Sequence, residues 1–166
     1  RLLDGLGVER AVVHGVSWGG VLVQQFALDY LERCAAVIID SSSSEVNVAA
    51  SENWFRIGEN TRAGVGGGRD VPSEQVDSLV ARARGIAGLR EHPYTPRLKD
   101  ITCPVLVVAG GKDEVAGAGG SVLMARNLPN ARLEIFQESG HGVYSHERDS
   151  YRSLVREFGR EQGVLS

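Results

Sequence analysis

The sequence predicts an α/β fold, in which helices flank a mostly parallel sheet and a short helical cap is inserted. Four segments have the length of strands: the mainly apolar runs 11–14, 35–39 and 104–109, and the alternating run 132–136. Segments with helical spacing alternate with them, at 2–6, 18–31, 121–127 and 151–158. This alternation is typical of parallel sheets, because each crossover between parallel strands usually contains a helix.

The individual elements have distinct signals. The run 11–14 is short and buried in character and ends at Gly15, and the helix that follows carries Leu22, Phe26 and Tyr30 on successive turns. The run 35–39 is closed by Asp40 and a run of serines. In the last third, 104–109 is wholly apolar, 132–136 alternates, and the final helix has one apolar stripe. The stripe consists of Tyr151, Leu154, Val155 and Phe158.

The middle of the chain differs in character and predicts the cap. Residues 45–98 are polar and mixed, and a glycine-rich break covers Gly64 to Gly68. After it, Pro72-Ser73 caps a helix with Val76 on its apolar face. We therefore divide the chain into core segments 1–44 and 99–166, with the cap at 45–98 between them.

Composition excludes several classes of function. The chain has 166 residues, a net charge of −3 and interleaved charges, which gives no reason to expect a nucleic acid or an anionic membrane as partner. The longest apolar runs are too short to span a bilayer. Cys34 and Cys103 each adjoin a buried strand without a metal-like spacing, so we expect reduced core thiols in a cytoplasmic protein. No cluster of ligand residues indicates a metal.

A nucleophile motif lies between the first strand and the next helix. Gly15-Val16-Ser17-Trp18-Gly19 matches G-x-S-x-G, which places a serine on a strained turn at the carboxyl edge of a sheet. Such a turn is so tight that we expect side chains at Gly15 or Gly19 to clash. The backbone N–H of Trp18 is then an expected oxyanion donor, at the positive end of a helix dipole.

Two later loops carry the partners that such a serine needs. A serine hydroxyl requires a base to remove its proton and a carboxylate to orient that base. Asp113 follows the apolar run 104–109, and His141 follows the run 132–136, in the order serine, acid, histidine. The sequence thus predicts Ser17, Asp113 and His141 as a catalytic triad.

Alternatives for the acid and the base stay open. Asp40 ends the preceding strand, and Glu114 is a third candidate acid, while we favour Asp113. The other histidines have simpler interpretations: His14 packs within its strand, His146 is a surface residue, and His92 belongs to a cap loop. The serines after Asp40 are most simply a polar loop.

The glycine-rich segments do not indicate phosphate binding. Gly64 to Gly68 follows no strand, and Gly110-Gly111-Lys112 lacks the Walker spacing and has Asp113 where a hydroxyl residue should stand. We therefore predict no phosphate site and no cofactor.

Together these residues resemble the α/β-hydrolase superfamily over nearly the whole chain apart from the cap. The segment 15–34 is similar to the elbow and helix of capped hydrolases, including polyhydroxyalkanoate depolymerases. The segment 43–47 and Trp54 are more similar to 3-oxoadipate enol-lactonases. Leu31 stands where such proteins usually have proline, a change in a helix-end turn.

The resemblance implies a serine hydrolase acting on a small-molecule ester or lactone through an acyl-enzyme. Trp54 and Phe55 are candidate substrate-binding residues of the cap, with core packing as the alternative. The same triad also serves C–C bond hydrolysis and haloperoxidation, whereas epoxide opening normally uses aspartate as nucleophile. A non-catalytic binding protein, or a fragment without function of its own, is the remaining alternative.

The resemblance also implies strands before the elbow that this sequence does not contain. No initiating methionine is present, and we expect the sequence to be the C-terminal part of such a hydrolase, with its elbow strand unpaired on one side. The absent strands include the loop that supplies a second oxyanion N–H. Losing one such donor typically costs on the order of 100- to 1000-fold in turnover, so we expect low activity from this chain alone.

Overall fold

The structure is a computed structural model that describes residues 1–65 and 71–165. The chain forms two compact units, one made of Arg1–Ser44 and Tyr94–Ser166 and the other of Glu45–Pro93. Of the glycine-rich break predicted at Gly64 to Gly68, the last three residues lie outside the described part.

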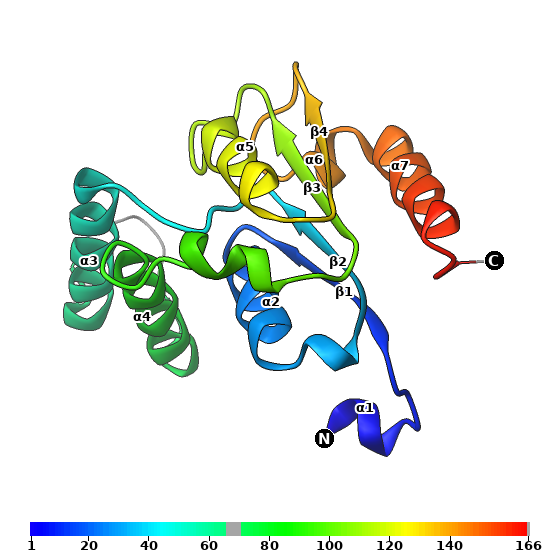
Figure 1. Cartoon of the computed structure of the whole chain (residues 1–166). Helices are drawn as coiled ribbons and strands as arrows, with labels where there is room; N and C mark the ends of the chain where they lie inside the picture. The colour runs from blue at the N-terminus through cyan, green and yellow to red at the C-terminus, as the bar shows by residue number, and fades with distance from the viewer. Residues whose placement is uncertain (66–70, 166) are drawn as a thin grey trace. The chain divides into compact units, whose positions relative to one another are not determined.

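The first unit is built on a four-stranded sheet whose strands are all parallel (Figure 1). The strands lie side by side in chain order: β1 (Ala11–Val16), β2 (Cys34–Asp40), β3 (Val105–Gly110) and β4 (Ala131–Phe136). This confirms the predicted α/β class. Because parallel strands all end at one edge, the loops that follow β1, β2, β3 and β4 meet there.

Helices cover both faces of this sheet. On one face, α2 (Trp18–Asp29), the 3-10 helix η2 (Thr95–Asp100) and α5 (Ala118–Asn127) pack on Val105 and Val107 of β3. On the other, α6 (Val143–His146) and α7 (Arg148–Glu161) pack on Leu106 and Val108. Successive side chains of a strand point to opposite faces, so β3, wholly buried, contributes to both cores.

The stripe predicted on the last helix is the one that packs. Tyr151, Leu154 and Phe158 are buried in the second core, and Val155 is partly buried against it. The helix predicted over 18–31 ends earlier, at Asp29, and Leu31 opens a separate 3-10 helix, η1 (Leu31–Arg33).

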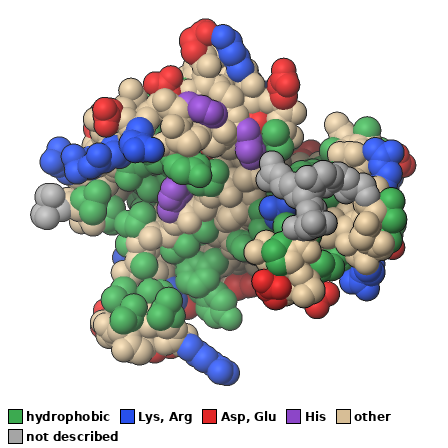
Figure 2. Space-filling model, turned by 180° about the vertical axis from the view of Figure 1, so that it is seen from behind, with side chains coloured by type: hydrophobic (Ala, Val, Ile, Leu, Met, Phe, Trp, Pro, Cys, Tyr) green, Lys and Arg blue, Asp and Glu red, His purple; other side chains and the backbone are tan. Residues whose placement is uncertain are grey.

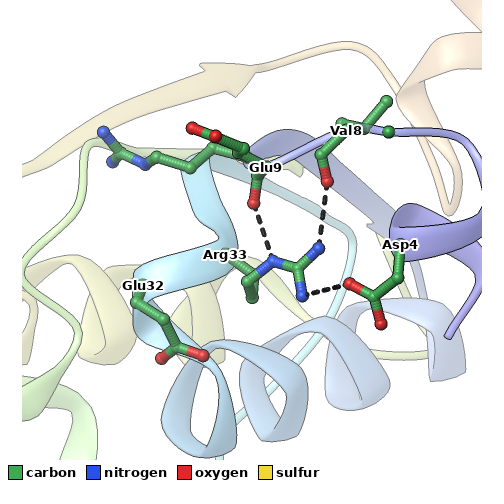
Figure 3. A pocket seen from close by; sticks show the side chains of 7 residues that line it. Asp4, Val8, Glu9, Glu32 and Arg33 are labelled. Atoms are coloured by element: carbon green, nitrogen blue, oxygen red, sulfur yellow. Dashed lines mark hydrogen bonds and ion pairs between the residues drawn. The ribbon is translucent and has the colours of Figure 1, made fainter.

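At the amino ends of the strands, Arg33 joins η1 to the short helix α1 (Leu2–Gly5) (Figure 3). Its guanidinium donates to the carbonyl oxygens of Glu9 (2.7 Å) and Val8 (2.9 Å) and pairs with Asp4 at 2.8 Å. The hydrogen bond from Arg33 lowers the pKa of Asp4. A pocket of about 550 Å³ opens here, but both arginines that line it donate to backbone carbonyls of the chain itself, Arg10 to Cys34 and Arg33 as above, so the pocket is a structural junction rather than a site.

β1 forms an edge of the sheet, and in the described residues only β2 pairs with it. Beside this edge lies a groove of about 580 Å³ whose apolar lining includes Leu2, Val12, Val13, Phe26 and Tyr30. In Figure 2, exposed apolar side chains gather next to α1, at the lower left. The open edge matches the expectation of an elbow strand unpaired on one side.

The second unit is a pair of helices, α3 (Val48–Ala63) and α4 (Ser73–Gly88). Asn47 caps α3 by accepting the N–H of Ala50, and asparagine is one of the residue types that helix N-termini favour at this position. The predicted cap on α4 is only partly correct, because α4 begins at Ser73 with Pro72 before it and no side chain accepts a bond there. Within the described part of the chain, no helix is long and apolar enough to cross a membrane.

Candidate active site

Ser17 occupies a sharp turn between β1 and α2. Its backbone angles, φ 54° and ψ −119°, lie in a region that residues other than glycine rarely adopt. The turn is held from the neighbouring strand, since the N–H of Ser17 donates to the carbonyl oxygen of Asp40 at 2.8 Å. The strained elbow conformation predicted from G-x-S-x-G is therefore present at this serine.

The glycines that this turn requires differ in part from the prediction. A side chain at Gly15 would overlap the carbonyl of Gly19, as expected. At Gly19 itself, however, an added Cβ meets nothing within 4 Å, so the predicted clash there is wrong. The second tight position is Gly20, where a Cβ would run into the side chain of Ser42 in the loop after β2. The constraint comes from tertiary packing rather than from the turn.

Asp113 lies in the loop after β3 and is buried, with only 1% of its side chain exposed. Its Oδ1 accepts the N–H groups of Val115 (2.8 Å) and Ala116 (2.9 Å). Burial acts to raise the pKa of Asp113, but the hydrogen bonds from His141, Ala116 and Val115 outweigh it and leave this pKa below its ordinary value. The carboxylate is thus held ionised and fixed in direction.

His141 lies in the loop after β4 and faces this carboxylate. Its Nδ1 is 2.9 Å from Oδ2 and 3.1 Å from Oδ1 of Asp113. A proton on Nδ1 is favoured by the carboxylate, which leaves Nε2 with the lone pair that a general base needs. The ring is partly exposed, with 28% of its side chain accessible.

The two loops that carry this pair approach each other backbone to backbone. A Cβ at Gly110 would overlap the carbonyl oxygen of Gly140, and one at Gly111 would lie 2.6 Å from that of Gln137. The N–H of Lys112 also donates to the carbonyl of Ser139 at 2.9 Å. The Gly110-Gly111 pair therefore has a structural use, which is to let the acid loop and the histidine loop touch.

The remaining candidates for acid and base have other partners. Asp40 is buried, and its Oδ1 accepts the hydroxyl of Ser41 at 2.7 Å. His14 Nε2 hydrogen-bonds Tyr151 Oη at 2.9 Å, and burial lowers the pKa of His14. Three other candidates, His92, Glu114 and His146, are exposed. Within the described residues, only Asp113 is hydrogen-bonded to His141.

The register of the strands, rather than a direct hydrogen bond, places Ser17 at the same edge of the sheet as the Asp113–His141 pair. Val16 is paired with Asp40 across β1 and β2, and Asp40 with Val108 across β2 and β3, so β1 and β2 end level while β3 continues to Gly110. Among the residues that the structure describes, no hydrogen bond joins the hydroxyl of Ser17 to His141. Trp18 is the first residue of α2, a position whose N–H has no acceptor within a helix.

The proposed cap residues lie in the second unit. Trp54 is half-buried on α3, whereas Phe55 is exposed and lines a groove of about 550 Å³ together with Ala87 of α4. Cys34 and Cys103 are buried free thiols of the first unit. No cluster that could hold a metal occurs among the described residues.

Ser41 has a place in this region that its sequence context does not predict. Ser41 was expected to belong to a plain polar loop, but it is buried, has a positive φ of 51° and accepts the N–H of Gly142, directly after His141. A serine run gives no signal of this kind, because the bond joins residues that are 101 positions apart.

The sequence profile of the alpha/beta hydrolase family matches residues 1–153. The chain belongs to the alpha/beta hydrolase family. The predicted superfamily is thereby confirmed, and the profile covers the elbow, the acid loop and the histidine loop.

Three relatives indicate how varied this family is. The chain is 28% identical to a poly(3-hydroxyalkanoate) depolymerase of Ectopseudomonas oleovorans, over 98% of the chain and 65% of that protein. It is 36% identical to a proline iminopeptidase of Lactobacillus delbrueckii subsp. bulgaricus, over 93% of the chain and 67% of that protein. It is 26% identical to 3-oxoadipate enol-lactonase 2 of Acinetobacter baylyi, over 83% of the chain and 60% of that protein. The chain spans about two thirds of the length of such relatives.

A solved structure supports the fold. The chain superposes on a thermophilic esterase from Thermogutta terrifontis with a TM-score of 0.74 and 24% identity, covering 97% of this chain and 69% of that one. This likeness concerns the architecture alone.

Proposed function

We propose that this alpha/beta hydrolase cleaves an ester or lactone with Ser17 as nucleophile, His141 as general base and Asp113 as the residue that orients the base. The observation that carries the proposal is the Asp113–His141 pair, at the sheet edge where Ser17 occupies the strained elbow. The depolymerase and enol-lactonase relatives support an ester or lactone as substrate class.

The proposed reaction follows from the protonation states. His141 Nε2 takes the proton of Ser17 Oγ as that oxygen attacks the substrate carbonyl, and the Trp18 N–H stabilises the resulting oxyanion. His141 then protonates the leaving oxygen, which gives an acyl-Ser17 intermediate and an alcohol. Water, deprotonated by the same Nε2, attacks the acyl group and releases a carboxylic acid with free Ser17.

Asp113 contributes electrostatically. The imidazolium that forms at His141 lies against an ionised, buried carboxylate, and two backbone N–H groups keep that carboxylate from turning. The ring therefore keeps one tautomer and one direction throughout the reaction. The assignment of Trp54 and Phe55 of the second unit as substrate-binding residues stays a prediction.

A substrate panel tests this proposal. Purified chain is assayed against p-nitrophenyl esters, a small lactone, a proline p-nitroanilide and a dienone-type C–C substrate, with Ser17→Ala and Ser153→Ala as the matched pair. Ser153 is exposed on α7 and serves as the control. We expect slow ester or lactone turnover, in keeping with the low activity expected of this chain alone, that Ser17→Ala abolishes and Ser153→Ala leaves unchanged. Turnover of the anilide or the dienone alone would contradict the ester or lactone assignment.

A further inference from the structure

The end of β2 makes direct contact with the loop that carries His141. The hydroxyl of Ser41 donates to Asp40 Oδ1 at 2.7 Å, and Ser41 Oγ accepts the backbone N–H of Gly142 at 3.0 Å. Ser41 is 1% exposed, so this bond is shielded from water. In such surroundings an unpaired N–H is costly, and the bond fixes its partners more firmly than a surface contact does.

Ser41 is itself fixed to the strands on both sides. Its N–H donates to the carbonyl of Val108 on β3 at 2.9 Å, and the carbonyl of the preceding Asp40 accepts the N–H of Ser17 at 2.8 Å. A single short segment after β2 therefore contacts the elbow, the strand that leads to the acid loop, and the histidine loop.

The histidine loop needs such an anchor because of its own sequence. His141 stands between Gly140 and Gly142, and Gly142 has a left-handed backbone with φ 75°. Glycine has many accessible conformations, so the loop has little local stiffness. Asp113 fixes the ring at Nδ1, whereas Ser41 fixes the chain one residue further on.

The hydroxyl is also what distinguishes Ser41 from a glycine. Its φ of 51° is a conformation that glycine adopts without strain and that a serine adopts at a cost. The two hydrogen bonds of the hydroxyl offset that cost.

We propose that Ser41 is a positioning residue for His141, whose hydroxyl holds the histidine loop so that Nε2 faces the elbow serine. This inference rests on the proposed function. Ser41 acts through the Gly142 N–H and has no role in proton transfer.

The test uses Ser41→Gly and Ser41→Ala, with Ser42→Ala as the control. Ser42 is an adjacent buried serine whose hydroxyl has no hydrogen-bond partner among the described residues. Ser41→Gly removes the hydroxyl without backbone strain, which keeps the test valid if Ser41→Ala folds poorly. Amide hydrogen exchange at Gly142, the NMR signal of the His141 ring protons and the rate of fluorophosphonate labelling of Ser17 are measured.

We expect Ser41→Gly to lose protection at Gly142 and to shift the His141 ring signals. Labelling should fall on the order of 10- to 100-fold, as for a small displacement of a catalytic group, with the shape of its pH profile altered. Ser42→Ala should behave as the parent chain. A Gly142 amide that stays protected in Ser41→Gly, or unchanged ring signals and labelling, would overturn the proposal.

The two proposals fail in different ways. If the parent chain is not labelled at Ser17, the proposed function is wrong for this chain, and the exchange and ring signals still decide whether Ser41 positions the loop. If labelling is strong and unaffected by Ser41→Gly, the function stands and the positioning role is refuted.

Discussion

His141 Nδ1 lies 2.9 Å from Asp113 Oδ2, and Asp113 is held in place by the N–H groups of Val115 and Ala116. Asparagine at position 113 would keep the shape but present an amide to the ring and favour the wrong tautomer. We expect Asp113→Asn to slow labelling of Ser17 on the order of 10⁴-fold. Rates are measured with a fluorophosphonate probe, and Glu114→Gln, which alters the exposed neighbouring carboxylate, is the control. Equal rates for the two variants would rule out the role given to Asp113.

The same carboxylate predicts a pH dependence of stability. The folded-state pKa of Asp113 lies below its ordinary value of 3.8, so its ionised form favours folding. Its stabilisation is present above that value and is lost as the pH falls through the folded-state pKa. Chemical denaturation should show the parent chain more stable than Asp113→Asn near pH 6, with the difference shrinking in acid. A difference that is independent of pH would contradict this expectation.

The contribution of Asp40 to stability should depend on pH with the opposite sign, so Asp40 serves as an internal comparison. Burial raises the pKa of Asp40 above 3.8 and outweighs the bonds from Ser41 and Tyr144. The folded state therefore prefers its protonated form, and that stabilisation is lost as the pH rises through the folded-state pKa. Relative to Asp40→Asn, the parent chain should lose stability between acid and neutral pH. A relative gain would show that Asp40 is not desolvated as the structure indicates.

The two motif glycines should respond differently to alanine. Gly15→Ala overlaps the backbone of Gly19 and is expected to lower the free energy of unfolding by about 1–3 kcal/mol, as overpacking does. Gly19→Ala places its methyl in open space on α2 and should raise it by roughly 0.5–1 kcal/mol. Urea denaturation of both variants measures the difference. Equal losses would mean that the turn is tighter at Gly19 than the structure has it.

The open edge of β1 predicts self-association. An exposed strand edge beside an apolar groove is a template for pairing with another chain, and Val12 is exposed on that strand. We expect the chain to form concentration-dependent oligomers that Val12→Lys reduces. Light scattering over a dilution series measures the degree of association. The control is Val115→Lys, on an exposed loop. Val155→Lys is unsuitable as a control because Val155 packs against the core. A chain that stays monomeric at all concentrations would contradict the prediction.

Much of the site was predictable because its signals are local. Ser17 lies in a short motif with fixed geometry, and Asp113 and His141 each lie in the loop that follows a strand-length run. The carboxyl ends of parallel strands meet at one edge, so strand order alone brings their loops together. The α/β class followed from the same alternation of strands and helices.

The features that escaped prediction depend on contacts between distant segments. Gly20, rather than Gly19, is the second tight glycine because Ser42 packs against it, and no spacing rule relates those two positions. The hydrogen bond between Ser41 and Gly142 likewise depends on the positive φ of Ser41, a backbone conformation that a serine in the sequence does not predict. The sequence predicts no phosphate loop at the Gly110-Gly111 pair. The role of this pair in the contact between the acid loop and the histidine loop depends on the backbone of residues 137–140, which is distant in the sequence.

The measurement that tests the central claim most directly is fluorophosphonate labelling with the modified residue mapped by mass spectrometry. The parent chain, Ser17→Ala, His141→Ala and Ser153→Ala are treated in parallel. We predict a single modified serine, Ser17, in the parent chain and in Ser153→Ala, and none in the other two. Modification of another serine, or labelling of Ser17 that persists in His141→Ala at the parent rate, would contradict the account.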